Sequence, residues 1–333
     1  MRIQENIILS PYTTFHIGGA AKYFVTVTSE EELIEALKWA KDKRLNILPL
    51  GAGSNLLISD KGFDGLVVKI DIGGIEKDRD FISCGAGEKL DTLVAFCVEN
   101  GLQGMECLSG IPGSVGGSVV QNAGAFGQEI CETLKEVHIV DTKTIEHKTI
   151  KKSDCAFTYR SSVLIGNNSM VVTKACFELH PVERTKISFE SLKKELGDAA
   201  DIKTIRDTIL KERKLRSSFY DEKDPNSISA GCFFSNPIVE RSCFERISRD
   251  FPDIPHWDDK ERVKLSAGWM VEKSGFKRGH SEGNVGLSEK HALMVINKGG
   301  ADAEEIKAFT QKIRETVKSV FGVEMAYEVI FID

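Results

Sequence analysis

The chain lacks the features that would place it in a membrane or on a nucleic acid. No apolar run approaches the roughly 20 residues that a membrane-spanning helix needs, and the first fifteen residues have neither the basic start nor the apolar stretch of a secretory signal. Positive charge is not in excess either, because 44 Lys and Arg residues stand against 50 Asp and Glu residues. A local basic pocket is still compatible with this balance. We therefore expect a cytoplasmic protein that binds no nucleic acid and no membrane.

Paired cysteines are also missing. The eight cysteines are scattered, none of them forms a CxxC motif, and none sits beside a His at zinc-finger spacing. No metal site is therefore predicted. In a chain without an export signal the thiols should be reduced, and we expect all except Cys232 to fill the core like small hydrophobic residues.

The composition fits a folded protein of more than one domain. A length of 333 residues exceeds what one hydrophobic core usually supports, and 41% hydrophobic with 28% charged residues excludes a disordered chain. Strand-like runs from Leu45, Gly65 and Phe81 alternate with two helical patterns, the first opened by a capping box from Ser29 to Glu32. This alternation predicts an α/β or α+β fold. A shift to charged composition after residue 182 predicts a domain boundary there.

The last third of the chain predicts a capped helix from Asp302 to Phe321 and a final strand over residues 327–332. Alternation along that strand would put Glu328 on the same face as Ile330 and Ile332. An acid on an apolar face must be paired, protonated or functional. A Glu that reaches water at the start of the strand is the equally weighted alternative.

Two Gly-rich segments are candidates for phosphate binding. Residues 51–55 follow a strand directly, and residues 110–127 hold six Gly among eighteen positions. We interpret the longer segment as a structureless loop, and such loops inside compact domains are usually functional. Backbone N–H groups in glycine-rich turns form anion-binding concavities. Neither segment is a Rossmann or Walker A motif. For either segment alone, a flexible surface loop is the favoured interpretation. Because the chain has both, binding of a phosphate-bearing cofactor and a pair of surface loops have equal weight.

Two further segments carry chemistry. Arg160 lies in a loop-like setting and offers a bidentate fork for a carboxylate or phosphate, although a solvated surface Arg is favoured from spacing alone. In residues 229–237, SAGCFFSNP, the Gly-Cys pair gives close backbone access to the thiol of Cys232. From the residues alone, a buried structural Cys is the favoured interpretation.

Taken in order, these motifs resemble those of one family over nearly the whole chain. They are TFHIGG from Thr14, LGAGSNLL, GIPGSVGGSVVQNAGAFG, FTYRSS, SAGCFFSNP, LSAGWMVEKSGF, HALMVIN and GVEMAYEV. Each is moderately specific, but eight in the correct order are very specific. The family is UDP-N-acetylenolpyruvoylglucosamine reductase, also called UDP-N-acetylmuramate dehydrogenase, of bacterial peptidoglycan synthesis.

The resemblance implies an α+β protein with an FAD-binding domain of the p-cresol methylhydroxylase (PCMH) type at 1–182, divided into subdomains of about 1–75 and 76–182. A smaller α+β substrate-binding domain would occupy 183–333, with the last strand, 326–332, returning to the active site. FAD would be the cofactor, NADPH the reducing co-substrate, and a UDP-sugar enolpyruvyl ether the substrate of a monomer. The positions implied to bind FAD are Gly51, Ala52, Gly53, Ser54, Asn55, Leu56, Gly110, Ile111, Pro112, Gly113, Ser114, Val115, Gly116, Gly117, Asn122, Gly124 and Ala125.

The resemblance also implies three catalytic residues. Arg160 and Glu328 match the pair placed around the substrate carboxylate, where negative charge develops. Cys232 stands where the family usually has the Ser that protonates C2, and a thiol is the stronger acid of the two. The positions implied to bind substrate are Tyr159, Arg160, Arg213, Arg216, Asn236 and His291.

Other departures concern the contacts to the UDP group. Phe126 and Phe189 stand where family members often have Tyr, Ser235 replaces a frequent Lys, and Arg216 replaces a Lys that commonly contacts the diphosphate. These changes put the detailed UDP contacts in doubt and not the reaction.

Two other functions remain as alternatives. One is a PCMH-type flavin oxidase or dehydrogenase acting on another small substrate, in which a residue such as His16 would tether the flavin; we expect His16 to be a structural loop residue. The other is a flavin-free sugar-nucleotide binding protein, which the intact Gly-rich segments disfavour.

Overall fold

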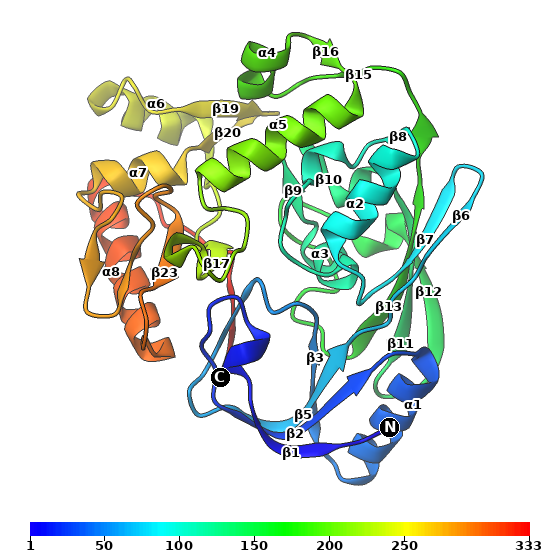
Figure 1. Ribbon diagram of the computed structural model, residues 1–333. Coiled ribbons are helices and arrows are strands. Elements are labelled where there is room, and N and C mark those ends of the chain that lie inside the picture. The colour runs from blue at the N-terminus through cyan, green and yellow to red at the C-terminus, as the bar shows by residue number, and fades with distance from the viewer. The chain divides into compact units, whose positions relative to one another are not determined.

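The computed structural model describes residues 1–333 and divides into two compact units. Unit 1 comprises residues 1–8, 20–53 and 63–214, and unit 2 comprises residues 9–19, 54–62 and 215–333. Figure 1 labels the helices and most of the strands of both units. None of the helices has the length and apolar character that crossing a membrane requires. The boundary expected near residue 182 and the subdomain division near residue 75 stay predictions.

The first sheet of unit 1 is mostly parallel. Its order is β1–β2–β5–β3, with β1 antiparallel to β2 and the other pairs parallel. The strands are β1 Gln4–Ile8, β2 Ala20–Val27, β3 Asn46–Leu50 and β5 Phe63–Ile70. Helix α1, Glu30–Asp42, contacts β2 and β5 and buries the predicted apolar stripe.

The cap of α1 differs in one detail from the predicted capping box. The side chain of Ser29 accepts a hydrogen bond from the N–H of Glu32 at 3.3 Å, as expected. The carboxylate of Glu32, however, accepts from the N–H of Thr28 at 2.7 Å. The acid therefore bonds to the residue before the N-cap. The predicted reciprocal hydrogen bond, from the N–H of Ser29 to Glu32, was wrong.

The second sheet of unit 1 is antiparallel throughout. Its order is β12–β11–β13–β7–β6. The strands are β6 Ile75–Asp78, β7 Phe81–Gly85, β11 Leu134–Asp141, β12 His147–Lys151 and β13 Met170–Glu178. Helix α2, Leu90–Glu99, packs its apolar side into the core of unit 1, and α3, Val115–Gln121, contacts both β7 and β13.

Helix α3 lies inside the longer Gly-rich segment, so the interpretation of that segment as a structureless loop was wrong. Ser114 caps the helix by accepting from the N–H of Gly117 at 3.3 Å, and Asn122 ends it with a φ of 51°. The small residues have a packing reason: a Cβ on Gly116 would lie only 2.8 Å from the Cβ of Ala86. Glycine here lets a short helix approach the sheet closely.

The rest of unit 1 consists of short elements and a helical segment. The short strands are β8 Leu102–Gln103, β9 Gly124–Ala125, β10 Gln128–Glu129, β14 His180–Pro181, β15 Thr185–Lys186 and β16 Ala199–Ala200. Helices α4, Glu190–Leu196, and α5, Ile202–Leu215, follow. Helix α5 buries Ile202, Ile205 and Ile209, which lie at helical spacing.

Unit 2 contains three small sheets, ordered β17–β23–β22–β21, β18–β20–β19 and β24–β4. The strands are β4 Leu56–Ile58, β17 Ser229–Cys232, β18 Ile238–Glu240, β19 His256–Asp259, β20 Arg262–Leu265, β21 Ser281–Glu282, β22 Val285–Leu287, β23 Met294–Asn297 and β24 Ile330–Ile332. The helices are α6 Arg241–Asp250, α7 Ala267–Lys273 and α8 Ala303–Phe321. Helix α8 has the predicted Asp302 cap and ends at Gly322 in the left-handed conformation.

The final strand is shorter than predicted. Only Ile330–Ile332 forms β24, which pairs in parallel with β4, and Tyr327 makes an isolated bridge to Phe234. Glu328 lies before the strand, so the argument that alternation puts it on the face of Ile330 and Ile332 was wrong. The backbone of Glu328 bonds to other segments instead, as described below.

The expectation of core thiols holds for four of the seven cysteines that it covered. All eight are free, and Cys84, Cys97, Cys107 and Cys155 are buried. Burial raises the pKa of Cys84, Cys97 and Cys107 to about 12, so these thiols are inert. The expectation of core thiols was wrong for Cys131, Cys176 and Cys243, which are only half-buried.

Candidate active site

In unit 1 the two Gly-rich segments meet. Gly51 follows β3 directly, and a Cβ at this position would lie 2.5 Å from the hydroxyl oxygen of Ser114. That hydroxyl is already engaged, because it caps α3. The backbone of the first segment therefore touches the N-terminal end of the helix in the second.

The longer segment is tied to two helices by an acid that we did not predict. Asp91, in the first turn of α2, accepts from the N–H of Gly110 at 2.7 Å and pairs with Arg206 of α5 through contacts of 2.6 and 2.9 Å. Burial by itself would raise the pKa of Asp91, but the hydrogen bonds from Arg206 and Gly110 outweigh it and hold the pKa below its ordinary value. An acid in the first turn of a helix normally suggests only a favourable helix-dipole contact, so no sequence signal points to this role.

Arg160 lies against the backbone of the longer Gly-rich segment. Its guanidinium donates to the carbonyl of Asn122 at 3.4 Å and to the carbonyl of Gly124, and it lies 3.7 Å from the carboxylate of Glu129. A Cβ on Gly124 would come within 2.9 Å of the guanidinium. Glycine at 124 therefore leaves the space that Arg160 occupies. The structure thus brings a predicted catalytic residue together with two predicted cofactor positions.

The side chain of Asn122 connects the segments around Arg160. It is fully buried and donates to Glu129 at 2.8 Å and to the carbonyl of Thr158 at 3.0 Å, while its oxygen accepts from the N–H of Cys131. A buried amide with donors and acceptor engaged fixes its neighbours firmly. The loop that carries Arg160 and the end of α3 are held to one another through this side chain. Glu129 was not predicted.

The two Phe residues that replace expected tyrosines pack on one another. The rings of Phe126 and Phe189 meet edge to face with centroids 5.4 Å apart, and the guanidinium of Arg213 lies 5.8 Å from the Phe126 ring. An edge-to-face pair needs no hydroxyl. With Phe at both positions the two rings pack directly on one another, and Arg213, a predicted substrate-binding residue, lies beside this pair. Tyr159 similarly lies beside its neighbour, with the Arg160 guanidinium 5.0 Å from its ring.

In unit 2, three separate motifs converge on the backbone of Glu328. Its N–H donates to the carbonyl of Phe233 at 2.9 Å, and its carbonyl accepts from the side chain of Asn55 at 3.0 Å. The main-chain carbonyl of Asn55 also accepts from the N–H of Ile330 at 3.0 Å. The half-buried Glu328 is thus fixed between the first Gly-rich segment and the residue that follows Cys232.

Cys232 ends β17 opposite Met294 and is half-buried. Gly231 before it has a φ of 75°, a conformation that glycine adopts without strain. Phe233 after it is fully buried, with its ring edge-on to those of Phe15 and Tyr327. The thiol is therefore presented at a strand end that an aromatic cluster anchors.

Two predicted substrate residues, Asn236 and His291, have identifiable surroundings in unit 2. Asn236 accepts from the N–H of Ala267 at 2.9 Å and so helps to start α7. Desolvation, reinforced by the positive charges of Arg216 and Arg278, lowers the pKa of His291 to about 4. The Nδ1 atom of His291 faces the N–H of Leu293 at 3.2 Å, which requires the neutral ring to accept there. His291 is therefore neutral at physiological pH.

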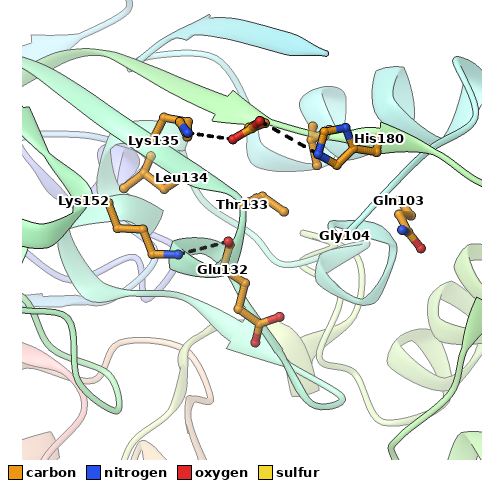
Figure 2. A pocket seen from close by; sticks show the side chains of 10 residues that line it. Gln103, Gly104, Glu132, Thr133, Leu134, Lys135, Lys152 and His180 are labelled. Atoms are coloured by element: carbon orange, nitrogen blue, oxygen red, sulfur yellow. Dashed lines mark hydrogen bonds and ion pairs between the residues drawn. The ribbon is translucent and has the colours of Figure 1, made fainter.

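A surface pocket of about 460 Å³ lies elsewhere in unit 1 (Figure 2). Lys135 pairs with Glu178 at 2.7 Å on its wall, and Lys152 donates to the carbonyl of Glu132 at 3.0 Å. None of the predicted site residues lines this pocket. It is therefore not the candidate active site.

The residues present fit a bound FAD. Gly51 and Gly116 stand where a Cβ would fill the contact between backbone segments, and Gly53 has a φ of 63°. Such glycine-lined backbone allows close approach of a phosphate-bearing group. His16, the alternative tether for a flavin, has its Nε2 atom 2.8 Å from the hydroxyl of Tyr220, as expected for a structural loop residue.

Comparisons with known proteins agree with this picture. Residues 21–147 match a family described as "FAD binding domain", and residues 224–332 match the C-terminal domain of UDP-N-acetylenolpyruvoylglucosamine reductase. Proteins named UDP-N-acetylenolpyruvoylglucosamine reductase are similar over almost their full length. The one from Thermobifida fusca is 36% identical, covering 98% of this chain and 97% of its own, and the one from Streptomyces avermitilis is 38% identical, covering 96% and 92%.

A solved structure extends the likeness to the fold. UDP-N-acetylenolpyruvylglucosamine reductase from Thermus caldophilus superposes with a TM-score of 0.72 at 26% identity, and the match covers all of both chains. The chain is an oxidoreductase with an FAD-binding domain, and the full-length matches favour a reductase over a flavin oxidase. The sequence-derived expectation of α+β architecture is confirmed. The chain belongs to the UDP-N-acetylenolpyruvoylglucosamine reductase family.

Proposed function

We propose that the chain reduces the enolpyruvyl ether of UDP-N-acetylglucosamine to UDP-N-acetylmuramate, a step of peptidoglycan precursor synthesis, with NADPH as the reductant. FAD, when bound, supplies the hydride transfer, so the protein's task is to bind, orient and provide charge. One observation carries the proposal: the match to a reductase of this name covers 98% of the chain. The cytoplasmic location and the monomeric state stay predictions.

The backbone of residues 51–56 and 110–125 holds FAD in this proposal. Support comes from the contact between Gly51 and Ser114 and from the glycine at 116, which leave no room for side chains. Backbone N–H groups and the capped N-terminus of α3 then face the anionic part of the cofactor.

Arg160 binds the carboxylate of the substrate. A planar guanidinium pairs with a carboxylate through two parallel hydrogen bonds, and the carbonyls of Asn122 and Gly124 set its plane before substrate arrives. Glu328, held through its backbone by Phe233 and Asn55, provides a second group at the same carboxylate. A cation fixed there, with Glu328 held beside it, stabilises the charge that builds up in the transition state.

Cys232 delivers the proton that C2 needs. Reduction adds a hydride to C3 and a proton to C2, and the thiol S–H bond breaks as the new C–H bond forms. The resulting thiolate regains its proton from water. With a reference pKa of about 8.5, a thiol is mostly protonated at neutral pH and can act as the acid.

Arg213 and Arg216 bind the diphosphate, with Tyr159, Asn236 and His291 lining the substrate. The support is chemical: guanidinium groups recognise phosphate oxygens bidentately, and the lowered pKa of His291 leaves a neutral ring that adds no charge.

A steady-state assay with product identification tests the proposal. NADPH consumption should depend on the enolpyruvyl UDP-sugar, and mass spectrometry should show a product that has gained one hydride and one proton. Acid precipitation of the protein should release the flavin into solution. NADPH consumption that proceeds equally without the sugar, or flavin that stays attached to the precipitate, would instead favour the oxidase alternative.

A further inference from the structure

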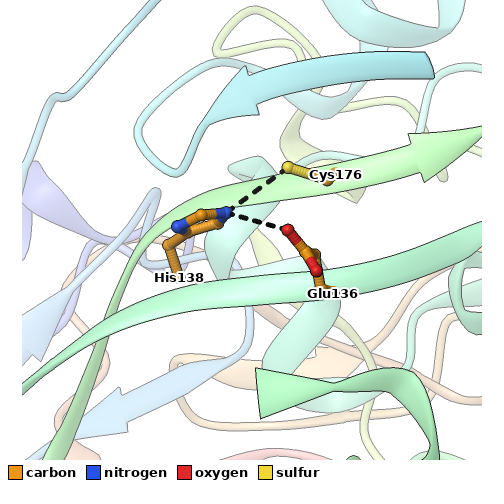
Figure 3. Close-up of side chains that lie close together, drawn as sticks. All are labelled: Glu136, His138 and Cys176. Atoms are coloured by element: carbon orange, nitrogen blue, oxygen red, sulfur yellow. Dashed lines mark hydrogen bonds and ion pairs between the residues drawn. The ribbon is translucent and has the colours of Figure 1, made fainter. Parts of the chain in front are cut away.

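We propose that Glu136, His138 and Cys176 form a binding site for one Zn²⁺ ion on the antiparallel sheet of unit 1. Figure 3 shows the three side chains turned toward one another across strands β11 and β13. Their ligand atoms all lie within 4.8 Å of one another. The site is independent of the flavin and substrate residues.

The register of the sheet brings the three residues together. Glu136 and His138 are two positions apart on β11 and so project from the same face, and Cys176 of β13 stands directly opposite Glu136. The pairing of β11 with β13 shifts register on both sides of this short stretch, between Leu134 and Glu136 and between His138 and Ile139. Such irregularities re-aim side chains and are common beside functional sites.

Two of the three distances between ligand atoms match the coordination geometry of zinc, and the third is below 4.8 Å. The Nε2 atom of His138 lies 3.4 Å from a carboxylate oxygen of Glu136 and 3.6 Å from the sulfur of Cys176. A tetrahedral Zn²⁺ with ordinary bond lengths holds nitrogen and oxygen ligands about 3.4 Å apart and nitrogen and sulfur ligands about 3.6 Å apart. One nitrogen, one sulfur and one oxygen donor is a set that suits zinc among the common divalent ions.

A hydrogen-bond relay fixes the histidine in the form that binds metal. The Nδ1 atom of His147 lies 2.9 Å from the carboxylate of Glu30, which can only accept, so Nδ1 carries the proton. In the neutral tautomer of His147 the other nitrogen accepts, across 3.3 Å, from the Nδ1–H of His138. This assignment follows from the network, and it leaves the lone pair of the His138 Nε2 atom directed toward Glu136 and Cys176.

That lone pair faces the sulfur of Cys176, which can donate its S–H across 3.6 Å, and a carboxylate oxygen of Glu136, which can only accept. Glu136 offers only acceptor oxygens, and two acceptors 3.4 Å apart repel one another. A cation among the three groups removes the repulsion. His147 and Glu30 then supply the outer partners that orient a metal-bound histidine, and Thr173, which donates to Glu30 at 3.0 Å, holds the end of the relay.

Binding exchanges ligands without any change of oxidation state. The three side chains replace water molecules of the hydrated ion, and the thiol proton of Cys176 passes to solvent as the zinc–sulfur bond forms. The fourth position keeps a water molecule. The bound ion links β11 to β13 at the place where their register is irregular.

Cobalt is the probe that tests the proposal. The full-length, FAD-loaded protein is stripped of metal, kept reduced with a reductant that carries no thiol, and titrated with Co²⁺. We expect one equivalent to bind, with a thiolate-to-cobalt charge-transfer band and with ligand-field bands at wavelengths beyond the flavin absorbance. Zn²⁺ should displace the cobalt and bind with a dissociation constant of about 1 µM or tighter.

Variants separate the site from adventitious binding. Cys176→Ser should abolish the charge-transfer band, and Glu136→Gln, at a partly exposed position that should not disturb folding, should weaken Zn²⁺ binding at least tenfold. His147→Gln should weaken it about 10–100-fold with the cobalt spectrum unchanged, because His147 positions a ligand without being one. The control is Cys243→Ser, which removes another half-buried thiol and should change nothing. A wild type without the charge-transfer band, or the same band in Cys176→Ser, would overturn the proposal.

Discussion

Arg160 lies between two main-chain carbonyls and the carboxylate of Glu129. The two carbonyls orient the guanidinium without adding formal charge, whereas the carboxylate of Glu129 offsets part of its positive charge. At the scale of single residues, Arg160 in the proposed function binds the substrate, and the flavin loops bind the cofactor.

The substitution Arg160→Lys should affect one half-reaction selectively. Lysine keeps the charge but loses the planar fork, so reoxidation of the NADPH-reduced enzyme by the UDP-sugar should slow by on the order of a hundredfold. The rate of flavin reduction by NADPH should change little. Stopped-flow absorbance under anaerobic conditions measures both rates. Equal losses in the two half-reactions would contradict the assignment of Arg160 to the substrate.

Cys232 should behave as a proton donor that serine can replace. Cys232→Ala should slow the reaction with the UDP-sugar by on the order of a hundredfold, a typical general-acid contribution, while Cys232→Ser should recover much of the rate. Peroxide should inactivate the wild type and spare the Ser variant, with recovery by a thiol reductant if oxidation stops at the sulfenic acid. An Ala variant with a near wild-type rate would make Cys232 a packing residue.

At the scale of elements, the contact between the loop after β3 and the start of α3 shapes the flavin site. Gly51→Ala would place a Cβ 2.5 Å from the hydroxyl oxygen of Ser114. Either the loops separate or the serine turns and α3 loses its cap. We expect the dissociation constant for FAD to rise about tenfold or more, equivalent to at least about 1.4 kcal/mol, as measured by flavin fluorescence.

A second substitution and a control make this test specific. Ser114→Gly in the same chain removes the obstructing hydroxyl, and glycine is tolerated at an N-cap, so the double variant should recover FAD binding. Gly73→Ala is the control, because its Cβ would lie at an ordinary 3.4 Å from the Glu88 side chain. If Gly51→Ala binds FAD as tightly as the control does, the contact has no part in cofactor binding.

The regular elements were largely predictable from sequence, and the errors have physical causes. Helix α8 follows its Asp302 cap and Gly322 stop as predicted, because these signals act locally. Helix α3 was missed because its glycines argue against a helix, while close packing on Ala86 favours it. The last strand was predicted too long, because the bonds of Glu328 to Phe233 and Asn55 depend on segments remote in sequence.

The candidate site divides in the same way. The glycine motifs and Arg160 could be found from sequence because motif order carries the resemblance. Asp91 and Glu129 could not, because each acts through a partner that only the fold brings near, Arg206 for one and Asn122 for the other. The cluster of Glu136, His138 and Cys176 was not predicted for the same reason, because Cys176 lies on another strand.

At the scale of the whole molecule, His291 should make stability depend on pH. Its pKa is about 4 in the folded protein against an ordinary value of 6.5, so between these values the unfolded chain binds the extra proton. Stability therefore falls as the pH falls from about 6.5 to about 4. In His291→Gln this contribution is lost, and the urea midpoint should decline less steeply over the same window. An identical decline in both proteins would contradict the lowered pKa.

The central claim is that one flavin site takes electrons from NADPH and delivers them to an enolpyruvyl UDP-sugar. The most direct measurement is anaerobic: NADPH is added to the FAD-loaded protein until the flavin absorbance bleaches, and the UDP-sugar is then added in one equivalent. The account predicts full return of the flavin absorbance with stoichiometric formation of UDP-N-acetylmuramate. Absorbance that stays bleached until oxygen is admitted would contradict it.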